Sequence, residues 1–313
     1  MQNRKKALVL LNMGGARDKN ELKMFLTNMF NDKNILTIKS NLLRKLIAYF
    51  ITTKRLDDAW KNYEYIGNQS PINPITEKLV DKCNIELKEY KTYQVMRYTP
   101  PFAQDVIKNI LEDGMEEIIL LPLYPQYSTT TTKSSVEDFI DFLPYSFGNN
   151  IRYIETFYKN DSFNSCIVNE IEKTLANSKD FNLIFSAHGL PQKIVDNGDP
   201  YETQMIEHVE ILSKMLELKG LKFKSINLAY QSKVGPLKWL EPSLDEKLKE
   251  FKEQKVLIYP LAFIVDNSET DFELDIEYRH IANDLGVAEY RVCKCVNDSD
   301  DFIEAIKDIC EIK

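Results

Sequence analysis

The sequence predicts an α/β protein of two similar lobes, each with a four-stranded parallel sheet flanked by helices, facing each other across a cleft. Short, nearly continuous apolar runs alternate along the 313 residues with stretches of helical periodicity, a pattern typical of parallel strands covered on both faces. The predicted strands are residues 6–12, 92–98, 117–124, 151–157, 182–188, 225–231, 255–264 and 289–296, and the clearest helical patterns are 101–112, 164–177 and 200–218.

The predicted strands form two related sets of four. Leu121-Pro122 in the third strand has a counterpart in Tyr259-Pro260 of the seventh, and the Asn-Asp-Ser after the fourth strand recurs after the eighth at nearly the same separation. Only the first set carries an insertion, of roughly forty residues, between its first two strands. We therefore expect an N-terminal lobe over 1–158 with an insertion at about 16–75, a C-terminal lobe over 159–297, and a C-terminal helix over 298–313 that packs on the first lobe.

Composition limits the classes of function. The net charge of −8, without a long run of one sign, argues against nucleic acid as the main partner, because duplex binding normally needs a basic face. The five cysteines form no CxxC pair and suit reduced thiols better than a disulfide framework or a zinc site. The first apolar run is too short for a signal peptide, and no apolar stretch is long enough to span a bilayer. We expect a cytoplasmic protein.

The insertion contains a helical pattern over 41–55. Its apolar side chains gather on one face and basic side chains surround them. The apolar residues are Leu42, Leu43, Leu46, Ile47, Phe50 and Ile51, and the basic ones are Arg44, Lys45, Lys54 and Arg55. Two interpretations stay open: a helix packed on its own lobe, or an apolar lip beside a hydrophobic ligand or a membrane surface.

One histidine is distinguished by its position. Ligands of open parallel sheets bind beyond the carboxyl ends of the strands, and His188 ends the fifth predicted strand beside Gly189. A neutral imidazole at this rim can bind a transition metal or accept a proton near neutral pH. His208 and His280 lie within helical patterns, and we expect them to be structural or merely exposed.

An acidic row begins at the rim of the seventh strand. Glu269, Glu273 and Glu277 recur every four residues, with Asp266 just upstream, so the three glutamates share one face of a helix. Like charges at this spacing repel, and a solvated acidic face is the common outcome. The alternative is functional, because a row of carboxylates leading into a cleft can pass a divalent cation inward or protons outward.

A set of motifs resembles those of the ferrochelatase family, in family order and over nearly the whole chain. The motifs are Leu11-Asn12-Met13-Gly14-Gly15, Met96-Arg97-Tyr98, Tyr124-Pro125-Gln126-Tyr127-Ser128, Ser186-Ala187-His188-Gly189-Leu190-Pro191, Gly198-Asp199-Pro200-Tyr201, Gln231-Ser232-Lys233-Val234-Gly235-Pro236, and Glu269-Thr270 with Glu273-Leu274-Asp275-Ile276-Glu277. The resemblance implies two Rossmann-like, chelatase-type lobes. It also implies a lyase that inserts Fe²⁺ into protoporphyrin IX to form protohaem, the last step of haem biosynthesis.

The resemblance implies roles for single residues as well. It makes His188 and Glu269 the central pair, catalytic and metal-binding, and the acidic row of Asp266, Glu273 and Glu277 becomes a relay for protons or metal. The residues that match porphyrin-binding positions are Met13, Arg55, Tyr63, Ser70, Tyr124 and Ser128. The expected partners are the porphyrin and Fe²⁺. We expect a monomer with peripheral membrane contact through the lip near 41–55.

The chain also departs from the family pattern. Asn267 follows Asp266 where the family often has histidine. Some relatives bind a [2Fe-2S] cluster through C-terminal cysteines, but the spacing of Cys293, Cys295 and Cys310 does not match one, so we expect no cluster and no tightly bound cofactor. The alternative functions are a tetrapyrrole chelatase for another metal or macrocycle, such as cobalt or coproporphyrin III, and a non-catalytic tetrapyrrole-binding protein.

Overall fold

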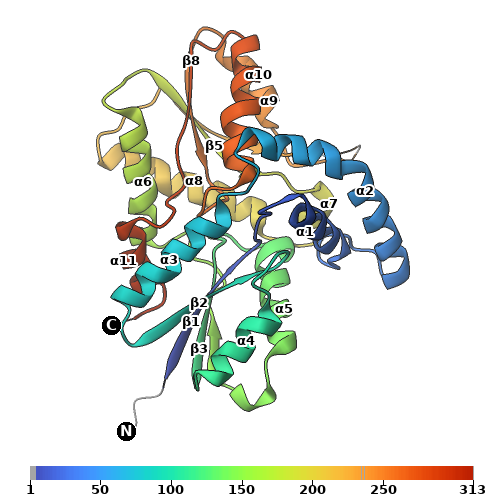
Figure 1. The fold of residues 1–313 in the computed structure, drawn as a ribbon. Coiled ribbons are helices and arrows are strands. Elements are labelled where there is room, and N and C mark those ends of the chain that lie inside the picture. The colour runs from blue at the N-terminus through green and yellow to red at the C-terminus, as the bar shows by residue number, and fades with distance from the viewer. Residues whose placement is uncertain (1–4, 234, 236, 313) are drawn as a thin grey trace. The chain divides into compact units, whose positions relative to one another are not determined.

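The computed structural model describes residues 5–233, 235 and 237–312, with the backbone alone at residue 146. The chain forms two compact units, whose elements are labelled in Figure 1. The first comprises the described residues up to Tyr124, Ser128–Glu155 and the described residues from Cys310 onward. The second comprises Pro125–Tyr127 and Thr156–Ile309. Each unit holds one four-stranded parallel sheet flanked by helices, which confirms the predicted fold class.

The two sheets have the same strand order, β2-β1-β3-β4 in the first unit and β6-β5-β7-β8 in the second. The two related sets of strands in the sequence are therefore a structural repeat. The strands of the first unit are β1 (Lys6–Asn12), β2 (Tyr90–Met96), β3 (Glu117–Pro122) and β4 (Ile151–Tyr153). Those of the second are β5 (Phe181–His188), β6 (Ser225–Gln231), β7 (Lys255–Pro260) and β8 (Glu289–Val292).

Four strands are shorter than predicted. β3 and β7 both end at a proline, Pro122 and Pro260, which has no N–H to donate to a sheet ladder. The apolar run continues beyond β3, β7 and β8 in buried connecting residues such as Leu123, Leu261 and Val296. Continuous hydrophobicity therefore predicts burial correctly at these strand ends, but it does not show where the ladder stops.

Each unit also contains α-helices and a π-helix. In the first unit they are α1 (Lys19–Asn31), α2 (Asn41–Tyr65), α3 (Ile72–Glu86), the π-helix η1 (Thr129–Lys133), α4 (Ala103–Glu112) and α5 (Ser134–Phe142). In the second they are α6 (Asp161–Leu175), α7 (Gln192–Asp196), α8 (Tyr201–Leu218), α9 (Leu244–Leu248), the π-helix η4 (Glu269–Glu277), α10 (Tyr278–Asp284) and α11 (Asp300–Ile309). Each sheet builds its own core: Val9 packs with Ile107 of α4 in the first unit, and Ile258 with Leu274 of η4 in the second.

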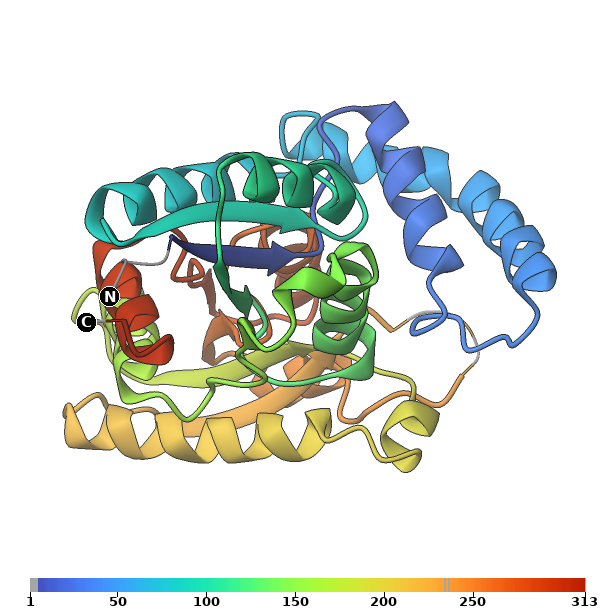
Figure 2. The same ribbon diagram turned by 90° about the horizontal axis from the view of Figure 1, so that it is seen from below.

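The insertion of the first unit forms α1 and α2. Leu22, Leu26 and Phe30 of α1 pack with Ala48 and Tyr63 of α2 in a small separate core. Figure 2 shows the pair of helices beyond the end of β1 toward which that strand points. The insertion therefore lies at the carboxyl edge of the first sheet, where ligands of such sheets bind.

The predicted placement of the C-terminal helix on the first lobe is wrong for α11. This helix belongs to the second unit and packs against α6, where the rings of Phe163 and Phe302 lie 6.1 Å apart between centroids. Asp308 accepts hydrogen bonds from Asn160 and Ser162 at 2.8 and 2.9 Å. The apolar face of α11 finds a matching face on α6, and only the residues from Cys310 onward join the first unit.

The first unit ends at Glu155, close to the predicted boundary at 158, but three residues earlier in the chain belong to the second unit. In that segment Gln126 donates to Nδ1 of His208 at 2.7 Å. The Nε2–H of the same ring donates to Asn164 at 2.8 Å. Burial lowers the pKa of His208 to about 3, so this ring is a neutral structural histidine.

Candidate active site

His188 ends β5, the strand at the centre of the second sheet beside β6 and β7. Its carbonyl accepts a hydrogen bond from the Tyr201 hydroxyl at 2.9 Å. The next residue, Gly189, donates its N–H to the Gln231 carbonyl at 2.9 Å. A Cβ on Gly189 would lie 2.8 Å from that carbonyl oxygen, so only glycine allows this close approach. The backbone on both sides of the imidazole is therefore fixed.

The structure brings His188 and Glu269 together. Nδ1 of His188 lies 2.8 Å from Oε2 of Glu269, at the carboxyl ends of neighbouring strands β5 and β7. The same carboxylate oxygen accepts from the Ser232 hydroxyl at 3.2 Å and from the Gln231 amide at 3.4 Å. An ionised carboxylate only accepts, so Nδ1 of His188 carries the proton. Nε2 has no hydrogen-bond partner among the residues that the structure describes, and it remains available for a ligand.

The charges in this pair stabilise each other. Burial alone would lower the pKa of His188, but the carboxylates of Glu269 and Glu273 outweigh it and raise this pKa to about 9. Burial likewise opposes ionisation of Glu269, yet the imidazolium and the hydrogen bonds from Ser232 and Gln231 hold its pKa below the usual range. At neutral pH the unliganded pair is therefore an imidazolium and a carboxylate.

The predicted acidic row is present on the π-helix η4. The Ser232 hydroxyl donates to Glu273 at 2.7 Å, and with its 3.2 Å contact to Glu269 it connects the first two glutamates of the row. Burial and the negative charge of Glu269 raise the pKa of Glu273 to about 7. Glu277, the third glutamate, is exposed to solvent. The row thus passes from the imidazole to the surface.

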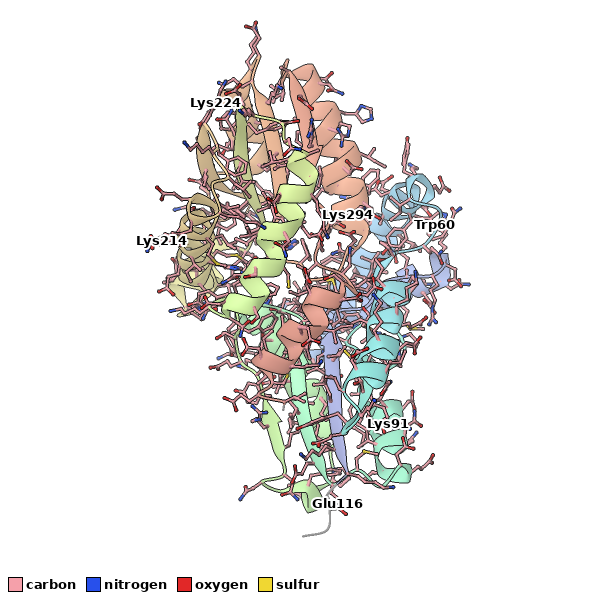
Figure 3. All side chains as sticks on the ribbon, turned by 90° about the vertical axis from the view of Figure 1, so that its left-hand side faces the viewer. Trp60, Lys91, Glu116, Lys214, Lys224 and Lys294 are labelled. Carbon is pink, nitrogen blue, oxygen red and sulfur yellow. The ribbon has the colours of Figure 1, made fainter. Side chains whose placement is uncertain are left out.

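The other acidic residues of η4 are neutralised. Asp271 pairs with Lys294 at 2.8 Å, and Asp275 pairs with Arg279. Figure 3 shows Lys294 beside this helix. With the aspartates paired to cations, the unpaired negative charge of η4 is concentrated on the side of the glutamate row.

Asp266, predicted as a member of the relay, does not join the row. Its buried carboxylate accepts from the Cys295 N–H and from the Asn297 amide, both at 3.0 Å, and pairs with Lys294 at 3.4 Å. The adjacent Asn267 accepts from the Glu269 N–H at 2.8 Å. Asp266 and Asn267 therefore hold the segment that leads into η4, because their side chains bond to backbone groups and to a neighbouring loop.

Met13 lies at the end of β1, the equivalent edge of the first sheet. Its N–H donates to the Asn12 side chain at 2.8 Å, and its carbonyl accepts from the Tyr98 N–H at 3.0 Å. Gly14 follows with φ +84°, and a Cβ there would lie 2.2 Å from the Thr99 hydroxyl. Glycine is needed for this turn, which leaves the half-buried Met13 side chain at the rim.

The other predicted porphyrin-binding residues also belong to the first unit. Ser70 is buried against Gly15, Tyr63 stacks on Trp60 with centroids 6.0 Å apart, and the exposed Arg55 guanidinium lies 6.0 Å from the Phe30 ring. Tyr124 is buried and lies 3.3 Å from the Ser135 hydroxyl. The Ser128 hydroxyl accepts from the Thr130 N–H at 3.2 Å and so caps η1. Of these residues, only Arg55 presents its side chain to solvent.

Helix α2 presents an apolar surface. One side, with Ala48 and Thr52, is buried on the insertion, whereas Leu42, Leu46 and Phe50 are 81%, 52% and 61% exposed. The helix packs on its own unit, as the first interpretation expects, and it also exposes an apolar face. The second interpretation, a lip beside a hydrophobic ligand or a membrane surface, stays a prediction. Among the described residues, no helix combines the length and the hydrophobicity needed to cross a membrane.

Four residues of the His188 site had no individual role in the sequence interpretation: Ser186, Tyr201, Gln231 and Ser232. Ser186 donates to the Gln231 side chain at 2.7 Å, which orients the Gln231 amide toward Glu269. Ser232 has φ +66°, a strained conformation that directs its hydroxyl to both glutamates. For Gln231 and Ser232, the signal that could have revealed them was their position at the carboxyl end of β6, next to β5.

All five cysteines are free and buried. Cys293 and Cys295 lie just beyond β8 rather than inside it, and Cys310 belongs to the first unit. Among the described residues, no three His, Cys, Asp or Glu side chains are arranged to hold a metal ion together. The absence of an iron–sulfur cluster remains a prediction.

Comparisons with known proteins identify the family of the chain. The family model described as Ferrochelatase matches residues 5–313. A ferrochelatase of Sulfurimonas denitrificans is 51% identical over 310 residues, covering 98% of both chains, and one of Helicobacter pylori strain P12 is 44% identical over 316 residues, covering 98% of this chain and 94% of that protein.

Solved structures are similar in fold. SirB from Bacillus subtilis with Fe³⁺ superposes with a TM-score of 0.60 at 10% identity, covering 98% of this chain and 94% of SirB. CbiX, described as the terminal enzyme of sirohaem biosynthesis in denitrifying bacteria, gives 0.52 at 9% identity, covering 97% and 98%. At such low identity these likenesses show the fold alone. The family model and the full-length sequence matches show more: the chain belongs to the ferrochelatase family.

Proposed function

We propose that the protein is a ferrochelatase that inserts Fe²⁺ into protoporphyrin IX to form protohaem, the last step of haem biosynthesis. The observation that carries the proposal is the His188–Glu269 pair at 2.8 Å, from which the glutamate row leads to solvent. Metal insertion requires a group that can bind the metal or accept a proton from the pyrrole nitrogens, together with a route by which two protons leave. The family membership supports the choice of iron and porphyrin.

In this proposal the porphyrin binds at the carboxyl edge of the second sheet, with its metallated face toward Nε2 of His188. Bending the macrocycle out of plane exposes the pyrrole nitrogens and lowers the cost of reaching the geometry of insertion. Nε2 is the unpartnered nitrogen of a half-buried ring, so it is the atom of the site best able to meet iron or a pyrrole proton.

His188 has to release a proton before it can accept one. With a pKa of about 9 the resting imidazole is protonated at neutral pH, and the positive charge of an arriving Fe²⁺ favours its deprotonation. Glu273, with a pKa of about 7, is able to take and release protons there. The Ser232 hydroxyl can accept from one protonated carboxyl and donate to the other carboxylate. We infer that protons leave from His188 through Glu269, Ser232 and Glu273 toward Glu277.

On the first unit, we propose that Met13 and Arg55 contact the porphyrin directly. Arg55 is exposed and has no ion pair among the described residues, so its guanidinium is available to bind a propionate with two parallel hydrogen bonds. Tyr63, Ser70, Tyr124 and Ser128 are buried, which supports a role in shaping the rim behind these contacts.

The test is anaerobic incubation of the purified protein with Fe²⁺ and protoporphyrin IX, followed by absorbance. Appearance of the protohaem spectrum at a rate proportional to protein concentration is expected. Adding coproporphyrin III as a competing porphyrin, or Co²⁺ as a competing metal, distinguishes a ferrochelatase from chelatases for another macrocycle or metal. If the porphyrin binds, as seen by fluorescence, but no metal is inserted from any combination, the protein is a tetrapyrrole carrier and the proposal fails.

We also propose that α2 touches the membrane surface as a peripheral contact of a monomeric cytoplasmic enzyme. Its exposed apolar residues with basic neighbours are typical of helices that lie in the lipid interface, and five free thiols suit a reducing compartment. Such a contact would also shorten the path of a poorly soluble porphyrin.

Charged residues on the apolar face of α2 should weaken this contact. For Leu46→Asp with Phe50→Asp, we expect binding to vesicles that contain anionic lipid to fall by about tenfold or more, because two apolar groups no longer enter the interface. Co-sedimentation with the vesicles measures it. Leu218→Asp is the control, since Leu218 is 87% exposed on α8 of the other unit. If the parent protein, the double variant of α2 and Leu218→Asp all bind the vesicles equally, the proposed membrane contact is contradicted.

A further inference from the structure

A buried ionic cluster lies in the first unit, whereas the His188 site belongs to the second. One oxygen of Asp32, Oδ2, accepts hydrogen bonds from the Arg97 guanidinium at 3.1 Å, from the Tyr98 hydroxyl at 3.0 Å and from the Ser134 hydroxyl. The Asp32 side chain is 1% exposed. A buried carboxylate with three donors on one oxygen is held firmly, and the hydrogen bond from each donor is weakened or lost if the carboxylate is replaced.

Asp32 lies in the insertion, at the start of the turn between α1 and α2. It ends α1, and its second oxygen accepts from the Asn34 N–H at 2.8 Å, which shapes the turn toward α2. The carboxylate therefore belongs to the base of the insertion, and its position follows that of α1.

The first pair of donors connects Asp32 to the Met13 turn. Arg97 and Tyr98 follow β2, and their backbone N–H groups donate to the carbonyls of Asn12 at 2.8 Å and of Met13 at 3.0 Å. Two consecutive residues thus bind Asp32 through their side chains and the end of β1 through their backbone. Displacing their side chains would displace the Met13 carbonyl as well.

The third donor connects Asp32 to the segment after β3. Ser134 begins α5 directly behind η1, the helix that Ser128 caps. Arg97 donates to the Ser134 hydroxyl at 3.0 Å and pairs with Asp138 of α5 at 3.2 Å. One carboxylate oxygen therefore fastens three segments, the end of α1, the end of β2 and the start of α5.

We propose that Asp32 is a positioning residue for porphyrin binding: by fastening these three segments, its carboxylate sets the shape of the rim that carries Met13 and the base of the lip that carries Arg55. This inference rests on the proposed function. Asp32 touches no reacting atom in this scheme, and the chemistry at His188 belongs to the other unit. Loss of the carboxylate should therefore weaken porphyrin recognition and leave the chemical step nearly unchanged.

The test is Asp32→Asn, which keeps the shape of the side chain and removes its charge. Steady-state kinetics should show the KM for porphyrin rising by about tenfold, with kcat and the KM for Fe²⁺ within about twofold of the parent. Fluorescence titration without iron should show the same loss of porphyrin affinity. A merely structural role would instead lower the fraction of active protein, which reduces kcat at unchanged KM.

Asp113→Asn is the matched control. Asp113 also accepts from a lysine and a tyrosine, Lys91 and Tyr93, each at 2.6 Å, but both come from the first half of β2. Figure 3 shows Lys91 near Glu116, where the strands of the first sheet begin, at the opposite end from Met13. This variant should leave the KM for porphyrin unchanged.

Ser134→Ala is a second test variant, to be used if Asp32→Asn does not fold. It removes one donor and leaves the Arg97–Asp32 pair in place, and it should raise the KM for porphyrin by about threefold. An unchanged porphyrin KM in the folded variants, or a fall in kcat alone, would overturn the role of Asp32. Failure of the parent protein to insert iron would instead reject the proposed function, so the two failures are distinguishable.

Discussion

Replacing His188 with alanine is expected to reduce kcat for iron insertion by roughly a thousandfold or more, within the range that a positioned acid–base group contributes. The imidazole provides the unpartnered Nε2 of the site, and its loss also leaves Glu269 without its cation. Porphyrin affinity should change by less than about threefold, because the proposed direct contacts of the macrocycle with Met13 and Arg55 are on the other unit.

Anaerobic stopped-time assays of haem formation and fluorescence titration with porphyrin measure the two effects separately. His280→Ala is the control, because His280 is exposed on α10 and should behave as the parent. Near-normal turnover by His188→Ala would remove His188 from the mechanism. Loss of porphyrin binding of the same size as the loss of turnover would make it a binding residue instead.

Replacing Glu269 with glutamine is expected to lower kcat by on the order of a hundredfold, the effect of removing one preorganised charged partner. The substitution also changes the protonation of His188. The negative charge of Glu269 opposes the effect of burial and raises the pKa of His188 to about 9. Without that charge burial prevails, so the pKa should fall to near or below its ordinary value, and the ring should be neutral at pH 7.5.

The pH titration of the His188 ring by NMR, assigned with the His188→Ala variant, measures this shift. Asp271→Asn is the control, because Asp271 lies on the same π-helix but pairs with Lys294. If the pKa of His188 stays near 9 in Glu269→Gln, another group holds the proton on the ring. If kcat is unchanged while the pKa falls, the protonated pair has no part in turnover.

The fold was largely predictable because each physical signal was local. Continuous apolar runs of strand length, separated by helical periodicity, predict parallel strands, and the repeated order predicts two equal sheets. The pairing of His188 with Glu269 was also within reach, although 81 residues separate them. His188 ends β5, and Glu269 begins η4 in the segment that follows β7. Because β5 and β7 are neighbours in the sheet, the parallel topology brings both residues to one edge.

Other parts of the site depend on contacts that no local pattern shows. Asp266 has the spacing of a relay residue, but its carboxylate turns toward the backbone of Cys295 and the amide of Asn297. The conformation of Ser232, directly after β6, has φ +66°, which is atypical of serine. To predict that α11 packs on α6, one would have to know which apolar helix faces of the protein the other elements leave uncovered.

The interleaved path of the chain limits how the protein can be dissected. A fragment that starts after Glu155 holds most of the second unit but lacks the segment from Pro125 to Tyr127. In that fragment Nδ1 of the buried His208 would lose Gln126, its only hydrogen-bond donor among the described residues, and an unsatisfied buried acceptor costs about 1–3 kcal/mol. A split or circularly permuted version of this enzyme would therefore have to keep these three residues with the half that contains His188.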